Sequence, residues 1–105
     1  MQATLYEAAN EFEWARKLLP DSPDPRINLG LCLERAGRVE DALRAYDSAL
    51  EVAPESLAAM QGAAVLVVRA GRADPRLVEW LDAIALRTDD AGWREWAARR
   101  AASTH

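Results

Sequence analysis

The tetrapeptide RAGR occurs twice in this chain of 105 residues, at 35–38 and at 69–72. The copies are 34 residues apart, and other residues recur at the same interval. The recurring pairs are Pro20 and Pro54, Phe12 and Tyr46, Tyr46 and Trp80, Ala8 and Ala42, Ala15 and Ala49, and Ala49 and Ala83. A chance match of four residues would not bring these pairs with it. The chain therefore contains an internal repeat, and a period of this length is typical of architectures that stack one small unit.

The composition predicts that the repeated unit is helical. Alanine, the strongest helix former, supplies 22 of the 105 residues, whereas glycine and proline supply only five each. No stretch alternates apolar and polar residues as a half-buried strand would. We therefore expect an all-α protein, and the length is that of one domain.

Helix-boundary residues divide the central repeat into two helices. Ser22 is a candidate N-cap with Pro23 at the first helical position, and Gly37 suits the left-handed conformation that ends many helices. A second set of helically spaced apolar residues follows and stops before Pro54. Because the connection is short, the two helices are expected to be antiparallel. The copy of RAGR at 35–38 is then the turn of a helical hairpin.

The same residues resemble a known family. The dipeptide Leu29-Gly30, the small residue Ala42, the aromatic Tyr46 and the final Pro54 reproduce the pattern of the tetratricopeptide repeat, whose period is also 34 residues. The resemblance implies a short right-handed α-solenoid of antiparallel helix hairpins, with about two and a half repeats and a C-terminal capping helix. It also implies that Gly30 and Ala42 let the two helices of the hairpin approach closely.

Two positions depart from the family pattern. Arg26 stands where tryptophan is commonest, and Leu33 stands where tyrosine is commonest. Because both positions tolerate variation in the family, the resemblance holds over 23–56. Weaker versions of the pattern extend it over most of the chain.

We expect a single domain made of four segments. Residues 1–22 match only the second helix of a repeat, 23–56 form the well-formed repeat, 57–88 form a degenerate copy, and 89–105 form a capping helix and tail. The capping helix is predicted at about 91–102. Its apolar face consists of Trp93, Trp96, Ala97 and Ala101, and its outer face carries Arg94, Glu95 and Arg99.

The second helix of the degenerate copy has an ambiguous register. Arg76 occupies a position that the family gives to a small residue, and the dipeptide at 74–75, Asp-Pro, suggests that the helix starts late and slips by one residue. Two apolar faces fit equally well, and both stay open. They are Ala73, Leu77, Trp80, Ala83 and Ile84, and Leu77, Val78, Leu81, Ile84 and Ala85.

Charge narrows the location and the partners. The net charge of −4 argues against a general affinity for nucleic acid or anionic membranes, although residues 91–105 carry three arginines against one glutamate. The longest apolar run, 63–68, is too short to span a bilayer. Glu7, Glu11 and Glu13 interrupt the order of a signal peptide, so a cytoplasmic location is expected. Arginine supplies 12 of the 13 basic residues, a bias of GC-rich genomes that favours a bacterial source.

Residues for catalysis or metal binding are scarce. The single histidine, His105, ends the chain, and the single cysteine, Cys32, is expected on the packed side of its helix as a small hydrophobic residue. The acidic pairs at 40–41 and 89–90 occur where helices begin, where carboxylates complement the helix dipole. The sequence has no glycine-rich phosphate loop and no cluster of cysteine and histidine. We expect neither an enzyme nor a cofactor or metal site.

A protein without such chemistry is expected to act through a surface. In the family that this chain resembles, the first helix of each hairpin lines a concave side that binds partner proteins. The resemblance places seven candidate contact residues there, with Asp24, Glu34 and Ala58 beside them: Ile27, Leu31, Arg35, Gln61, Val65, Val68 and Arg69. The apolar members form a strip that a soluble monomer would not display without reason. The alternative is that the C-terminal helix folds back and covers this strip.

Two further interpretations concern the same side. Arg35 and Arg69, equivalent across the repeat, either favour an acidic partner or complement the C-terminal ends of their helices. Some members of the family clamp the C-terminal carboxylate of chaperones. That clamp fits poorly here, because Asn28 matches it but Ala58 and Gly62 stand where basic residues are expected.

The N-terminal segment suggests an end contact. Tyr6, Asn10 and Trp14 share one stripe of a helix, on a side that the family usually leaves polar, and the hairpin partner of this helix is missing. A longer solenoid, a second copy of the chain in a homodimer, or a partner protein would cover Tyr6 and Trp14. The favoured function is a non-catalytic protein–protein interaction module. The alternatives are self-assembly through exposed solenoid ends and an accessory domain of a larger enzyme or transport component.

Overall fold

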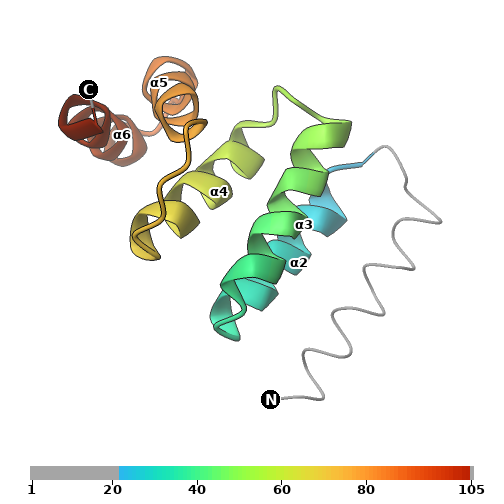
Figure 1. Cartoon of the computed structure of the whole chain (residues 1–105). Helices are drawn as coiled ribbons and strands as arrows, with labels where there is room; N and C mark the ends of the chain where they lie inside the picture. Colours follow the sequence, from blue (N-terminus) through green and yellow to red (C-terminus); the bar gives the residue numbers. More distant parts are fainter. Residues whose placement is uncertain (1–21, 105) are drawn as a thin grey trace.

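The computed structural model describes residues 22–104. Within this part every regular element is a helix, which confirms the all-α prediction. The five helices are α2 (Asp24–Arg35), α3 (Val39–Val52), α4 (Leu57–Arg69), α5 (Leu77–Arg87) and α6 (Ala91–Thr104). Each helix packs on the next along the chain, and α2 also packs against α4, so the hairpin α2–α3 stacks on the hairpin α4–α5 as a solenoid requires (Figure 1).

Both copies of RAGR form the same turn. Gly37 and Gly71 have φ angles of 77° and 65°, in the left-handed region that a side chain would disfavour. In each turn the N–H after the glycine donates to the carbonyl four residues before the glycine, at 2.9 Å. The glycine N–H donates to the carbonyl three residues back. This is the Schellman arrangement, and it explains why the tetrapeptide recurs: each copy ends the first helix of a hairpin.

The starts of the helices differ in small ways from expectation. The N-cap of α2 is Pro23 rather than Ser22, and no side chain caps this end. The hydroxyl of Ser56 caps α4 by accepting from the N–H of Ala59 at 3.2 Å. Asp90 caps α6, because its Oδ1 accepts from the N–H of Trp93 at 2.9 Å. One of the two acids predicted to start this helix therefore does so through its side chain.

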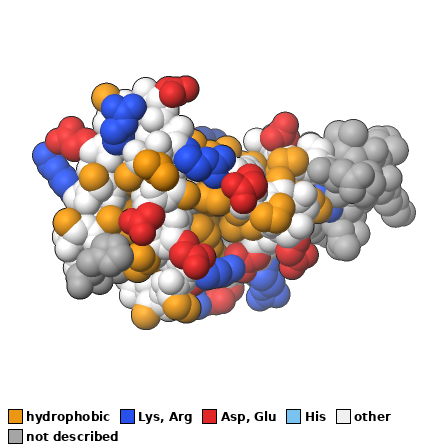
Figure 2. Space-filling view, turned by 90° about the horizontal axis from the view of Figure 1, so that it is seen from above, with side chains coloured by type: hydrophobic (Ala, Val, Ile, Leu, Met, Phe, Trp, Pro, Cys, Tyr) orange, Lys and Arg blue, Asp and Glu red, His pale blue; other side chains and the backbone are white. Residues whose placement is uncertain are grey.

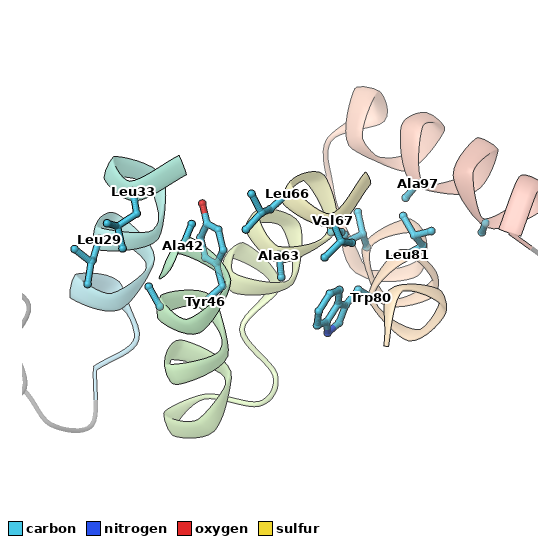
Figure 3. Close-up of a cluster of buried hydrophobic side chains, with 14 residues drawn as sticks. Leu29, Leu33, Ala42, Tyr46, Ala63, Leu66, Val67, Trp80, Leu81 and Ala97 are labelled. Atoms are coloured by element: carbon cyan, nitrogen blue, oxygen red, sulfur yellow. The ribbon is translucent and has the colours of Figure 1, made fainter. Parts of the chain in front are cut away.

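Tyr46 is the centre of the core between the two hairpins. Its side chain is fully buried on α3 and lies between the helices of the first hairpin and α4 (Figure 3). A Cβ atom at Gly30 would lie 2.6 Å from Cε1 of the Tyr46 ring, and one at Gly62 would lie 2.5 Å from the same atom. Gly30 was expected to admit a neighbouring helix. The group that occupies the space is this ring, which needs a glycine on α2 and another on α4.

The buried face of α5 combines the two predicted registers. The helix begins at Leu77, as late as the Asp-Pro dipeptide suggested, and its buried residues are Trp80, Leu81 and Ile84. Trp80 comes from one predicted face and Leu81 from the other, whereas Ala73 is exposed and lies before the helix. Neither face alone is therefore correct.

Ion pairs join the two hairpins in one direction. Among residues 22–104, arginines of the α4–α5 hairpin and its flanks contact acids of the α2–α3 hairpin and its flanks. The pairs are Arg69 with Glu34 at 3.5 Å, Arg72 with Glu40, Arg76 with Asp47 at 2.8 Å, and Arg87 with Glu55 at 3.6 Å. Each exposed pair contributes little to stability. Together they favour one register of the second hairpin on the first.

The last helix, α6, packs on α5 and extends to Thr104, beyond the predicted end. Its predicted apolar face is confirmed, since Ala97 and Ala101 are buried and both Trp93 and Trp96 are half-buried. Within the described residues the backbone of α6 makes no close contact with α4. The helix therefore does not lie on α4 as the first helix of another repeat would, and a hollow remains between the two.

Candidate functional site

One hollow lies between α2 and α4 and has a volume of about 350 Å³. Five of the seven predicted contact residues line it together with Glu34, Tyr46, Ala58, Gly62 and Trp93: Ile27, Leu31, Gln61, Val65 and Arg69. Leu31 is 41% exposed, although large aliphatic side chains favour burial. The structure thus brings most of the predicted strip to one open surface.

A second hollow of about 520 Å³ lies between α4 and α6. Its α4 side consists of Val65, Val68 and Arg69, and its other side comes from the start and middle of α6. The residues on that side are Asp90, Gly92, Trp93, Trp96 and Arg100. Because Val65, Arg69 and Trp93 line both hollows, the two adjoin and form one surface, which we call the groove.

The groove is open rather than covered by the C-terminal helix. Trp93 forms part of the wall of both hollows, but a volume remains on each side of it. Hydrophobic side chains gather across the middle of the face shown in Figure 2, with charged side chains of both signs around them. The alternative in which α6 folds over the strip is therefore wrong for the described residues. Instead, α6 adds tryptophan to the surface.

Arg35 is the one predicted contact residue that lies outside both hollows. It is exposed in the last turn of α2, where a cation complements the negative end of the helix dipole. Its counterpart Arg69 ends α4 in the same way but also lines both hollows. The two equivalent arginines therefore differ in their surroundings.

A chain of polar contacts supports the floor of the groove. The hydroxyl of Tyr46 donates to Oε1 of Glu34 at 2.9 Å, and Nη1 of Arg69 lies 3.5 Å from Oε2 of the same carboxylate. Burial, together with the hydrogen bond to this anionic acceptor, raises the pKa of Tyr46 well above its usual range. The phenol stays protonated and holds Glu34, which in turn positions Arg69 beside the apolar strip.

Sequence reasoning missed several members of this surface. It placed Glu34 on the concave side but gave it no partner, and it assigned Trp93 to a cap rather than to the groove. Neither the hydroxyl partner of Glu34 nor the position of Trp93 follows from helical spacing, because both depend on how distant helices cross. The close fit of Gly62 against Tyr46 had a signal, since a glycine inside a helical pattern indicates a tight contact.

The prediction for Cys32 is wrong, because this cysteine is exposed. The buried residues of α2 are Arg26, Leu29, Gly30 and Leu33. Cys32 is rotated by about 100° from Leu33 around the helix axis, which turns it away from α3 and α4. Arg26, in contrast, is buried, and its guanidinium donates to the hydroxyl of Ser48 at 2.9 Å and to the carbonyl of Ser22 at 2.8 Å. These bonds let arginine occupy a position that the family usually gives to tryptophan.

The candidate end contact at Tyr6 and Trp14 lies outside the described residues, as does His105. Within residues 22–104, no three side chains of histidine, cysteine, aspartate and glutamate gather as metal ligands would. The helices of this part of the chain are all too short or too polar to cross a bilayer.

Comparison with known families gives a clear match. A family model described as "Tetratricopeptide repeat" matches residues 6–51 and again residues 35–93. The two matches overlap, as expected when one repeated unit aligns in two positions, and together they span most of the chain. A search of curated proteins gives no significant match.

Proposed function

Because this chain belongs to the tetratricopeptide repeat family, whose repeats generally mediate protein–protein interaction, we propose that it is a non-catalytic module that binds a segment of a partner protein in the groove. The bound segment is a peptide or a helix, and the module acts in the cytoplasm. The observation that supports this proposal is the pair of adjoining hollows, which share Val65, Arg69 and Trp93 and bring Leu31 to the surface.

The chemistry of the groove suits a polypeptide segment. Apolar side chains from α2, α4 and α6 offer area to bury, and Gln61 and Arg69 offer polar groups that fix orientation. Each hollow falls within the range of about 300–1,000 Å³ that is typical of ligand pockets. The floor is rigid because Tyr46 is fully buried and bonded to Glu34, so little ordering is needed on binding.

The experiment selects ligands for the full chain from a displayed library of short random peptides and measures the affinity of recovered peptides by fluorescence anisotropy. Leu31→Glu should weaken binding by about tenfold or more, because it places a charge in the apolar strip. Leu86→Glu is the matched control: Leu86 is 87% exposed on α5 and lines neither hollow.

Circular dichroism of both variants checks that helicity is unchanged. Equal loss of affinity in the two variants, or full affinity in the Leu31→Glu variant, would place binding elsewhere. Failure to recover any peptide with the parent chain would refute the proposal itself.

A further inference from the structure

The structure of the α4–α6 hollow points to the chemistry of the partner. We infer that this hollow selects, within the segment bound in the groove, a large apolar side chain next to an acidic one. The inference rests on the proposed function and adds a specificity to it. It is carried by the two tryptophans and two arginines that line one hollow.

The apolar part of the hollow has two opposite walls. Val65 and Val68 come from α4, and Trp93 and Trp96 come from α6. The two indole rings pack edge to face with their centroids 5.5 Å apart, and both are only half-buried. Aromatic rings left partly exposed opposite aliphatic side chains form a slot for another large apolar side chain.

The charged part of the lining is positive. It holds Arg69 and Arg100 against one acid, Asp90, and the carboxylate of Asp90 is engaged in capping α6 through the N–H of Trp93. The side chain of Arg69 is 75% exposed and touches Glu34 at 3.5 Å. A guanidinium has five N–H donors, so this contact leaves donors for a ligand carboxylate.

The charge of the hollow is opposite to that of the whole chain. The full chain carries a net charge of −4, whereas the lining of this hollow carries two cations and one anion. The α2–α4 hollow differs, because Glu34 balances Arg69 there. An acidic segment is therefore attracted to the α6 end of the groove, which sets the direction in which the segment lies.

The hollow exists because α6 leaves the stacking pattern. A further repeat would place its first helix against α4, but α6 packs on α5 and makes no close backbone contact with α4 in the described part of the chain. The resulting space is lined by the side chains of α6 itself. The acid-plus-apolar preference is accordingly a property of this C-terminal helix rather than of the repeat.

The test uses the same displayed library and compares the peptides that the full chain recovers before and after single substitutions. The parent should enrich peptides with an acidic residue adjacent to an aromatic or large aliphatic one. Arg100→Glu should remove or invert the acidic preference, and it should weaken binding of a parent-selected peptide by about tenfold. Arg44→Glu makes the same charge change on a side chain that is 77% exposed on α3 and lines neither hollow, and it should leave both results unchanged.

A third variant tests the apolar slot. Trp96→Ala should lower affinity for the same peptide about tenfold while its circular dichroism spectrum stays helical. Peptides that depend on Leu31 but show no acidic preference, or that ignore Trp96 and Arg100, would overturn this inference and leave the groove proposal intact. Sedimentation that shows self-association abolished by Arg100→Glu would assign the hollow to a second copy and would also overturn it. No recovered peptide at all would refute both proposals.

Discussion

The fit of Tyr46 against two glycines predicts that the smallest possible enlargement of Gly30 destabilises the protein. A Cβ atom at position 30 would lie 2.6 Å from Cε1 and 2.8 Å from Cδ1 and Cζ of the Tyr46 ring. Carbon atoms pack best at about 3.5–4.0 Å, so the ring or the helix must move. The ring has no room to retreat, because Gly62 lies against the same edge and the hydroxyl is bonded to Glu34 at 2.9 Å.

The expected magnitude follows from two opposing effects. Replacing glycine by alanine inside a helix normally raises the free energy of unfolding by about 1 kcal/mol. Overpacking a close-packed core lowers it by about 1–3 kcal/mol. Gly30→Ala should therefore lower the free energy of unfolding by up to about 2 kcal/mol, as measured by urea denaturation followed by circular dichroism.

A change of background reverses the sign. Tyr46→Leu removes the Cε and Cζ atoms that a new methyl group would meet, at a cost of its own. In that background the helical preference of alanine is the larger effect, so Gly30→Ala should stabilise the protein by up to about 1 kcal/mol relative to Tyr46→Leu alone. If Gly30→Ala stabilises the parent as much as it stabilises the Tyr46→Leu variant, the ring does not set the size limit at this position.

Three other predictions concern charges and ends. Arg76 holds the pKa of Asp74 below its usual value of about 3.9, so Asp74 adds stability above that pH and loses it as the pH falls through the lowered pKa; urea titrations should show a larger loss in acid for the parent than for Asp74→Asn, and equal losses would contradict this. A double-mutant cycle of Asp47→Ala and Arg76→Ala should give a coupling free energy of about 0.2–1 kcal/mol, and zero coupling would mean that the ion pair joining the hairpins adds nothing. Sedimentation equilibrium should show that the full chain self-associates at high concentration and that a Tyr6→Glu, Trp14→Glu variant does so less; a parent that stays monomeric would refute the end contact.

The features that sequence predicted well are those governed by local physics. The turn glycines, Gly37 and Gly71, were identified because only glycine enters the left-handed region readily, and both do so. The late start of α5 was read from a single Asp-Pro dipeptide. Most of the groove followed from spacing along α2 and α4, because one face of a helix is determined once its neighbours are known.

The features that sequence missed depend on distant contacts. The register of α5 is one case, because Arg76 stacks over Trp80 at 4.7 Å while bonded to Asp47 at 2.8 Å, and neither contact has a signature in spacing. The exposure of Cys32 is another, because it depends on which side of α2 receives α3 and α4. The α4–α6 hollow is a third, because it arises from a helix that leaves the repeat.

The two copies of RAGR show why identity along the chain does not assign partners. Both tetrapeptides adopt the same backbone turn, so the repeat predicts conformation correctly. Their last arginines nevertheless differ: Arg38 pairs with Asp41 in its own helix, whereas Arg72 reaches across to Glu40 of the preceding hairpin. Conformation is set within the tetrapeptide, but a side-chain partner is set by the unit stacked in front of it. The specificity of the groove must therefore be assigned residue by residue, and Arg69 belongs to it even though Arg35, its equivalent in the repeat, lines neither hollow.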